Sequence, residues 1–351
     1  MGGARYFQKV LLTALGVVAL HFGILLTVRS RIPAEYEVRE FEVVKHWQVE
    51  QMGSPKIVFI GGSATLFGID AAQVEKTLGM PAFNYGMHAG LRLEDLMDNA
   101  RRSLKPGDML VMSLETPYYG AQGTDWTGWQ LRNELAWNHE AFDALPLFRR
   151  LLICAGASNP QLSFDLCQAC FLSKTDPKRL RAREQEMVPE AAILSRYQVR
   201  KGISKEYAFN VSDIDGNGDI LHATGMTGPL PALFPPTQPC AIQKDVKAAL
   251  AGFLVEMRER HVSVYFDYTP YIVEKPPGAD WKEAEAIFDG EIRSLGSEVL
   301  ERRDRFFYPR RLLFDSALHL NTEGREMRTK ELIEALRPKI EQAKVASANV
   351  P

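Results

Sequence analysis

The sequence predicts an α/β fold built on a parallel sheet, and three observations favour it. Short apolar runs rich in strand-forming residues recur at residues 56–60, 81–85, 109–114 and 261–266. Helical patterns separate several of these runs, as expected for crossover connections between parallel strands. The chain of 351 residues is 46% hydrophobic and 25% charged, which suits a folded protein with a large buried core.

An apolar run without formal charge occupies residues 10–28, near the amino terminus. As a helix it would be roughly 28 Å long, about the thickness of a hydrocarbon core. We therefore expect a single transmembrane anchor within residues 1–30. A buried core helix is the alternative. A cleaved signal peptide is disfavoured, because its apolar core is usually shorter and no A-x-A site follows the run.

A polar connector at residues 31–54 leads to the α/β domain, which we expect over residues 55–342. Its first strand, at 56–60, ends at a tight turn formed by Gly61 and Gly62. The following elements alternate in type: a helix at 71–78, a strand at 81–85, a helix at 93–104 and a strand at 109–114. In such sheets, ligands bind beyond the carboxyl ends of the strands.

The alternation stops at about residues 120–243, which we expect to form a large insertion with small helices of its own. The later elements are a helix near 245–260, a strand at 261–266, a weak strand at 298–300, a closing helix at 322–342 and a loose tail at 343–351. The prediction is therefore one interrupted α/β domain behind an anchor.

The charge balance and the cysteine content restrict which ligands and partners we expect. The chain has 42 Lys plus Arg against 44 Asp plus Glu, so no basic excess exists to hold a nucleic acid. The four cysteines allow two disulfides outside the cytoplasm, or four unpaired thiols. Cys167 and Cys170 could instead form half of a zinc site, but no second pair of ligands with suitable spacing is present.

Ser63 follows the first predicted strand directly, in the segment FIGGSATLFGID. The two glycines before it allow a sharp turn and leave room for a substrate. No P-loop lysine follows and no GxGxxG is present, so nucleotide binding is unsupported. The turn alone is weak evidence for a reactive serine at the sheet edge, because a simple helix cap fits it as well.

Asp315 and His319 lie four residues apart, just before the closing helix. One tight turn can bring both to the same edge, where Asp orients the imidazole and His takes the proton of a serine hydroxyl. The alternative is a turn that leads into the helix, with Asn321 or Thr322 as its cap. Together with Ser63, the segment favours a Ser–His–Asp triad.

The segment DIDGNGDI matches the first eight positions of a calcium-binding EF-hand loop. Its candidate ligands are Asp213, Asp215, Asn217 and Asp219. Position twelve is Thr224 rather than a bidentate glutamate, and no flanking helix pair is evident. Asp, Asn and Gly also form ordinary turns, so calcium is a weak prediction and an ordinary turn is the alternative.

The GGS turn, the segment at residues 84–90 and the DxxxHLN ending together resemble the SGNH, or GDSL-like, hydrolases. The chain is most similar to membrane-anchored bacterial members related to those of alginate acetylation and teichoic-acid D-alanylation. The resemblance implies a flavodoxin-like parallel sheet sandwiched by helices, and it leaves residues 120–243 unmatched. An α/β-hydrolase has the same triad order, but its elbow needs glycine where this chain has Thr65.

The resemblance also implies roles for individual residues. Ser63 would be the nucleophile and His319 the general base, oriented by Asp315. The backbone N–H groups of Ser63 and Gly90, or less favourably Gly86, would form the oxyanion hole.

The family usually completes that hole with an asparagine side chain. The equivalent position here is Glu115, which cannot donate a hydrogen bond while ionised. Glu115 and Asn321 are therefore candidates for support of the site rather than for the reaction itself.

The resemblance implies a membrane-anchored O-acyltransferase or esterase, for which we expect no cofactor. Its acceptor would be an envelope or secreted polysaccharide, and its partner a polytopic membrane acyltransferase. We expect the domain on the periplasmic side of a bacterial inner membrane, although basic residues after the anchor lean toward a cytoplasmic domain. The alternative, which Glu115 motivates, is a non-catalytic subunit of an envelope polysaccharide complex.

Overall fold

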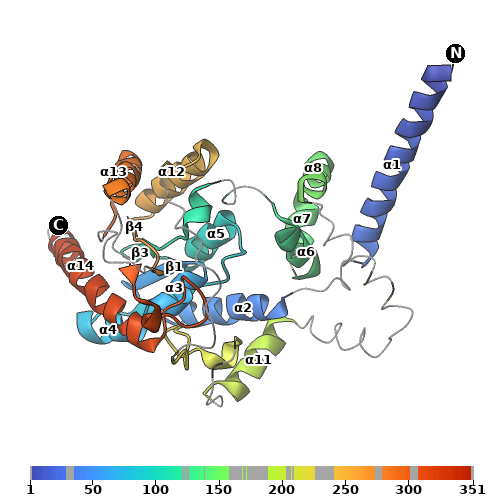
Figure 1. The fold of residues 1–351 in the computed structure, drawn as a ribbon. Coiled ribbons are helices and arrows are strands. Elements are labelled where there is room, and N and C mark those ends of the chain that lie inside the picture. Colours follow the sequence, from blue (N-terminus) through green and yellow to red (C-terminus); the bar gives the residue numbers. More distant parts are fainter. Residues whose placement is uncertain are drawn as a thin grey trace. The chain divides into compact units, whose positions relative to one another are not determined.

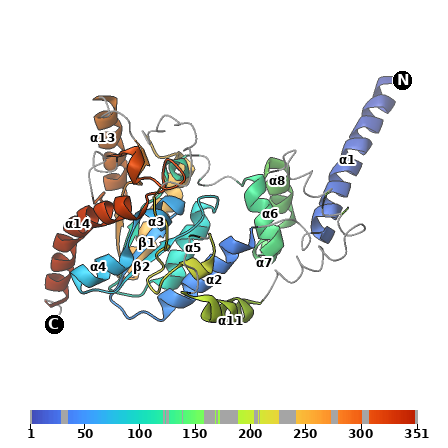
Figure 2. The same cartoon turned by 60° about the horizontal axis from the view of Figure 1, so that its bottom comes forward.

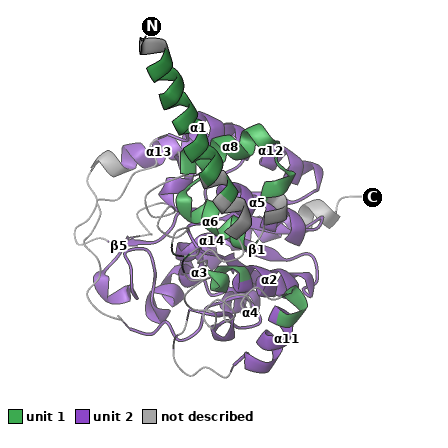
Figure 3. Ribbon diagram, turned by 90° about the vertical axis from the view of Figure 1, so that its right-hand side faces the viewer, with its two compact units in different colours: residues 1–39, 126–192 green, residues 40–125, 193–351 purple. Residues whose placement is uncertain are grey.

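The computed structural model divides the chain into two compact units (Figure 3). Unit 1 comprises residues 1–39 and 126–192, and unit 2 comprises residues 40–125 and 193–351. The structure describes residues 2–28, 35–120, 123, 126–137, 139–157, 168, 171, 189–202, 207, 209–225, 241–272, 279–300 and 307–348. Residues 193–225, which were expected in the insertion, therefore belong to the α/β unit.

Unit 2 contains a four-stranded sheet in the order β2-β1-β3-β4. Figure 1 labels β1, β3 and β4 of this sheet. The strands are β1 (Ile57–Gly61), β2 (Ala82–Gly86), β3 (Met109–Met112) and β4 (Ser263–Phe266). Every neighbouring pair is parallel, so the predicted α/β fold with a parallel sheet is confirmed. The weak strand at 298–300 is reduced to one parallel bridge, between Val299 and Phe266. A separate parallel pair joins β5 (Tyr271–Ile272) to β6 (Phe307–Tyr308).

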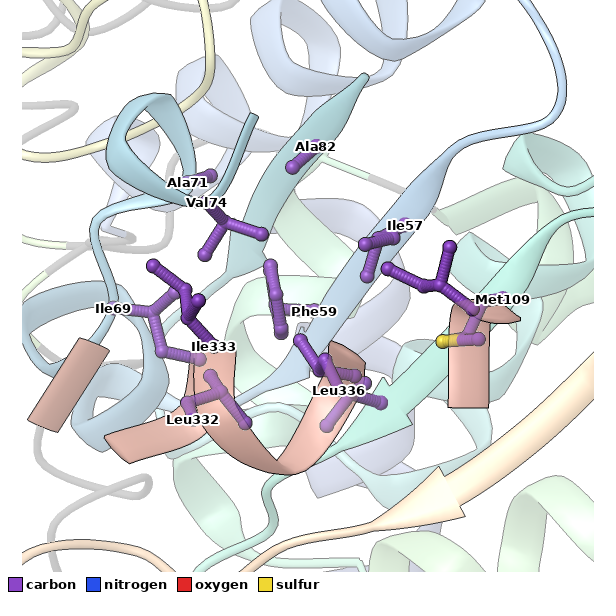
Figure 4. Close-up of a cluster of buried hydrophobic side chains, with 12 residues drawn as sticks. Ile57, Phe59, Ile69, Ala71, Val74, Ala82, Met109, Leu332, Ile333 and Leu336 are labelled. Carbon is purple, nitrogen blue, oxygen red and sulfur yellow. The ribbon is translucent and has the colours of Figure 1, made fainter. Parts of the chain in front are cut away.

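Two helices pack on one face of the sheet, α4 (Ala71–Leu78) and α14 (Thr322–Ala348). Figure 4 shows Val74 of α4 and Leu332 and Leu336 of α14 gathered around Phe59 of β1. All four side chains are fully buried, so removal of either leucine should cost about 2–5 kcal/mol.

Charged pairs connect three further helices: α2 (Tyr36–Glu50), which begins in unit 1 and lies mostly in unit 2, α5 (Leu93–Ser103) and α12 (Lys244–Glu259). Arg102 of α5 bonds to Glu42 of α2 at 3.0 Å, and Arg101 bonds to Glu256 of α12 at 2.8 Å. Figure 2 shows α5 and α2 across the sheet from α4 and α14. Helices therefore cover the sheet on both sides.

The remaining described helices of unit 2 are short or peripheral. They are α3 (Ser63–Gly68), α11 (Glu190–Arg200, which begins in unit 1), α13 (Ala279–Ser294) and the 3-10 turns Thr116–Tyr119, Val211–Asp213 and Arg310–Leu312. The closing helix α14 continues to Ala348, so the tail expected to be loose from residue 343 is helical over most of its length.

Unit 1 is helical where it is described, with α1 (Gly2–Val28), α6 (Gly128–Trp137), α7 (His139–Ala144) and α8 (Leu147–Ala157). A small core gathers residues from the last three: Leu131, Leu135, Phe142, Cys154 and Ala157. Cys154 is buried in this core. Cys167, Cys170 and Cys240 lie outside the described residues, so the predicted cysteine pairings do as well.

The apolar run predicted as an anchor lies in α1. Among the described residues, no helix combines the length and the apolarity needed to cross a membrane, so the anchor is not confirmed. The side chains of residues 21, 22 and 24–28, at the carboxyl end of the run, lie outside the described part of the chain.

Candidate active site

The turn after β1 places Ser63 at the carboxyl edge of the sheet, where α3 begins. The two preceding positions have no room for a side chain. A Cβ at Gly61 would clash with the Ser113 carbonyl and the Thr65 hydroxyl, and one at Gly62 would clash with the Glu115 carboxylate. The glycines are therefore required by close approach, as the sequence predicted for a tight turn.

The structure brings Ser63, His319 and Asp315 together in one hydrogen-bond chain. Nε2 of His319 lies 2.8 Å from Oγ of Ser63. Nδ1 of the same ring lies 2.6 Å from Oδ1 of Asp315. Both distances are those of hydrogen bonds, and the order of groups is that of a nucleophile, a base and an orienting acid.

A compact loop presents the histidine. Its ends pair through an antiparallel bridge between Leu313 and Leu320, and the Phe314 N–H donates to the His319 carbonyl at 2.8 Å. Inside the loop, the Ser316 hydroxyl accepts the His319 N–H at 3.1 Å. The turn thus accommodates the four-residue spacing of Asp315 and His319.

Stacked aromatic rings pack against the imidazole of His319. Phe67 of α3 stacks on His319 with ring centroids 4.3 Å apart and planes 12° from parallel. Phe314 stacks on Phe67 in turn, at 5.8 Å. The His319 side chain is 17% exposed and that of Asp315 is 36% exposed, so the pair borders solvent that a substrate could displace.

Asn321 supports this loop and does not face Ser63. Its Oδ1 accepts the Gly324 N–H at 3.0 Å, which caps the start of α14, and its Nδ2 donates to the Arg311 carbonyl at 2.8 Å. The sequence offered both a cap and a site-support role for this residue. The geometry combines them, because the cap fixes the loop that carries His319.

Glu115 follows β3 and binds the backbone on both sides of the nucleophile. Its Oε2 accepts the Gly62 N–H at 3.0 Å, and its Oε1 accepts the Ala64 N–H at 2.9 Å. The side chain is buried, and burial raises its pKa, while the two N–H groups and the charge of His319 act in the opposite direction. Glu115 therefore clamps the serine turn, a role that the sequence did not specify.

The expected oxyanion donors differ in availability. The Gly86 N–H donates to Oδ1 of Asn84 at 2.9 Å, and the Gly90 N–H donates to Nδ1 of His88 at 3.0 Å. Gly86 also allows close packing, since a Cβ there would clash with the backbone of Leu66. The Ser63 N–H has no acceptor among the described residues, so it is the donor best placed to meet a developing negative charge.

The acidic loop, residues 213–219, binds other groups of the protein with its side chains. Oδ1 of Asp215 accepts the N–H groups of Asn217 and Asp219, both at 2.9 Å. Asp219 accepts from the Ala72 N–H at 3.0 Å and from Nδ2 of Asn84 at 3.1 Å.

The other two calcium candidates point elsewhere. Nδ2 of Asn217 donates to Glu75 at 2.8 Å, and Asp213 pairs with His222 at 2.6 Å. Within the described part of the chain, no three His, Cys, Asp or Glu side chains converge as a metal site. The four side chains bind different partners, which favours the ordinary turn over the calcium loop.

A buried lysine anchors this loop, and the sequence carried no signal for it. Nζ of Lys45 donates to the carbonyls of Asn84, Gly86 and Gly218 at 2.8, 2.9 and 2.8 Å. Burial lowers the pKa of Lys45 to about 7, against the opposing charges of Asp219 and Asp215. The ammonium thus joins α2, the end of β2 and the acidic loop.

The chain was also compared with known proteins. No protein-family model matches it, and neither a curated protein nor a solved structure is similar to it.

Proposed function

We propose that the chain is an SGNH-type serine acyltransferase or esterase. The observation that carries this proposal is the chain of hydrogen bonds from Ser63 Oγ through His319 to Asp315, at 2.8 and 2.6 Å. The strand order β2-β1-β3-β4 supports it, since this is the order of flavodoxin-like sheets, whose ligands bind where the order reverses beside β1 and β3. Ser63 follows β1 and Glu115 follows β3.

The geometry supports catalysis through an acyl-enzyme. The Ser63 oxygen attacks the carbonyl carbon of an ester as His319 Nε2 takes the hydroxyl proton, and Asp315 stabilises the imidazolium. The Ser63 N–H faces the developing oxyanion. His319 then gives its proton to the leaving alcohol. Water or an acceptor hydroxyl attacks the acyl-serine, loses its proton to His319, and releases Ser63.

The acceptor and the location remain proposals from the sequence. An envelope polysaccharide acceptor, a polytopic acyltransferase partner and a periplasmic domain all follow from the resemblance to membrane-anchored family members. A carboxy-terminal phosphatase fusion tests the location: activity in intact cells is expected, and an inactive but stable fusion would contradict it.

A second candidate is a non-catalytic subunit with the same fold. Glu115 favours it, because a carboxylate stands where the family usually offers an asparagine donor to the oxyanion. This candidate predicts a Ser63 hydroxyl without enhanced reactivity.

The deciding experiment uses the purified full-length chain and p-nitrophenyl acetate. We expect acyl release by the wild type and loss of that release in Ser63→Ala. Ser103→Ala is the control, a serine outside the triad whose hydroxyl donates to the Asn99 carbonyl of α5. Equal rates of p-nitrophenolate release by the wild type and Ser63→Ala would contradict the proposed enzyme and favour the non-catalytic subunit.

A further inference from the structure

A second Asp–His pair lies in the α/β unit, formed by Asp213 and His222. Nδ1 of His222 is 2.6 Å from Oδ1 of Asp213, the same separation as in the His319–Asp315 pair. The Asp213 side chain is fully buried, whereas that of His222 is 35% exposed. As in the first pair, an acid fixes one ring nitrogen and leaves Nε2 on the other side of the ring.

Aromatic packing and a backbone hydrogen bond place the second pair beside the first. Tyr207 packs against Phe314 at 4.6 Å and Phe67 at 6.0 Å, and Phe67 stacks on His319. Burial raises the pKa of Tyr207, and the charges of both Asp315 and Asp213 add to this, so the phenol lies near both acids.

A backbone hydrogen bond also links the segments that carry the two pairs. The carbonyl of Ala223, next to His222, accepts the N–H of Thr322 at 2.9 Å, three residues beyond His319. The loop that carries the second pair is therefore bound directly to the loop that carries the first.

The backbone of His222 is unusual as well. Its φ is 59°, in the left-handed region that residues with a side chain seldom adopt. Its Nε2 has no hydrogen-bond partner among the described residues. A strained backbone that presents a partly exposed ring nitrogen beside a reactive group is typical of binding sites.

We propose that His222, held by Asp213, binds the polyhydroxylated acceptor of the acyl group through Nε2. This inference rests on the proposed function, since it assigns the acceptor side of that site. The acceptor oxygen forms a bond to the acyl carbon as the bond to Ser63 Oγ breaks. Its proton passes to His319 and then to Ser63, while His222 hydrogen-bonds a neighbouring hydroxyl and takes no part in the proton balance.

The test separates acylation of the serine from transfer to an acceptor. The full-length chain is given p-nitrophenyl acetate with glycerol as the probe acceptor. The burst of p-nitrophenolate reports acylation, and the ratio of acetylglycerol to acetate reports acceptor binding. The variants are His222→Ala, His222→Gln, which retains a hydrogen-bonding side chain, and His261→Ala.

His261 is a matched control. Its φ is 57°, its side chain is exposed, and it precedes β4 at the amino end of the strand, opposite the triad edge. Both alanine variants thus remove an imidazole from a left-handed position, and only one removes it from the loop that is hydrogen-bonded to the His319 loop.

We expect His222→Ala to lower the transfer ratio about tenfold with the burst unchanged, and His222→Gln to recover part of it. His261→Ala should behave as the wild type. An unchanged ratio in His222→Ala, an equal loss of burst and transfer, or a wild type that acylates but forms no acetylglycerol would overturn the assignment. A wild type without any burst would instead defeat the proposed function itself.

Discussion

Two loops of the α/β unit present acidic side chains to different kinds of partner. In the loop at residues 313–321, Asp315 binds a histidine whose other nitrogen reaches the side chain of Ser63, 256 residues away along the chain. In the loop at residues 213–219, Asp215 binds the N–H groups of its own turn, and Asp219 binds Ala72 and Asn84.

The two loops differ in the partners that their polar side chains contact. In the first loop, the second ring nitrogen of His319 lies beside the Ser63 hydroxyl on a partly exposed edge, as the proposed reaction requires. The second loop directs Asp215 and Asp219 to protein donors and receives a buried ammonium, so those groups hold the fold. In the sequence, the first motif suggested a triad and the second a calcium site, and only the positions of the partners distinguish the two loops.

The largest effect is expected from the first loop. His319→Ala removes the base, and ester hydrolysis should fall at least about 10⁴-fold with the free energy of unfolding little changed. Initial rates with p-nitrophenyl acetate and a urea unfolding curve measure the two quantities. Retention of a tenth or more of the activity would show that His319 is not the base.

The second loop should show the reverse pattern. Lys45→Met leaves three buried carbonyls without their donor, which should lower the free energy of unfolding by about 3–5 kcal/mol. Activity per folded molecule should change far less than in His319→Ala. A stable but inactive Lys45→Met would contradict the division of roles between the loops.

A substitution of Glu115 should affect both the free energy of unfolding and the reactivity of Ser63. Glu115→Gln replaces one of two acceptors with a donor that faces a backbone N–H, so we expect a loss of about 1–3 kcal/mol in unfolding. The rate of serine modification should fall with it, because the turn that carries Ser63 loosens. Glu326→Gln, at an exposed position of α14, is the control. A wild-type rate in Glu115→Gln would remove Glu115 from the site.

The pH dependence of unfolding sharpens the account of Lys45. Its pKa falls from 10.5 to about 7 on folding, so between these values the unfolded chain binds more protons than the folded one. This group should therefore make the free energy of unfolding rise with pH, by up to about 1.4 kcal/mol per unit. Urea curves at intervals from pH 7 to pH 9 should show the rise in the wild type and lack it in Lys45→Met. Identical slopes would contradict the assignment.

The smallest effect concerns calcium. Because the side chains of the acidic loop already have protein partners, millimolar calcium should leave the melting temperature unchanged relative to a chelator. A reproducible rise would show that the loop rearranges to take the ion, and would revive the calcium prediction.

Local patterns were sufficient for the sheet and for the three residues of the triad. Strand and helix runs alternate along the chain, and a serine after a strand and a DxxxH turn before a helix both meet at one sheet edge. The clamp by Glu115 and the ammonium of Lys45 were not predictable in the same way. Both depend on side chains that meet backbone groups tens of residues away, with no periodicity to mark them.

The most direct test of the central claim is covalent modification of the full-length chain by a fluorophosphonate, followed by mass spectrometry of its peptides. We expect one adduct, on Ser63, that forms in the wild type and is strongly reduced in His319→Ala. A folded wild-type chain that takes up no adduct, or takes it on another serine, would contradict the claim that Ser63, His319 and Asp315 form a reactive site.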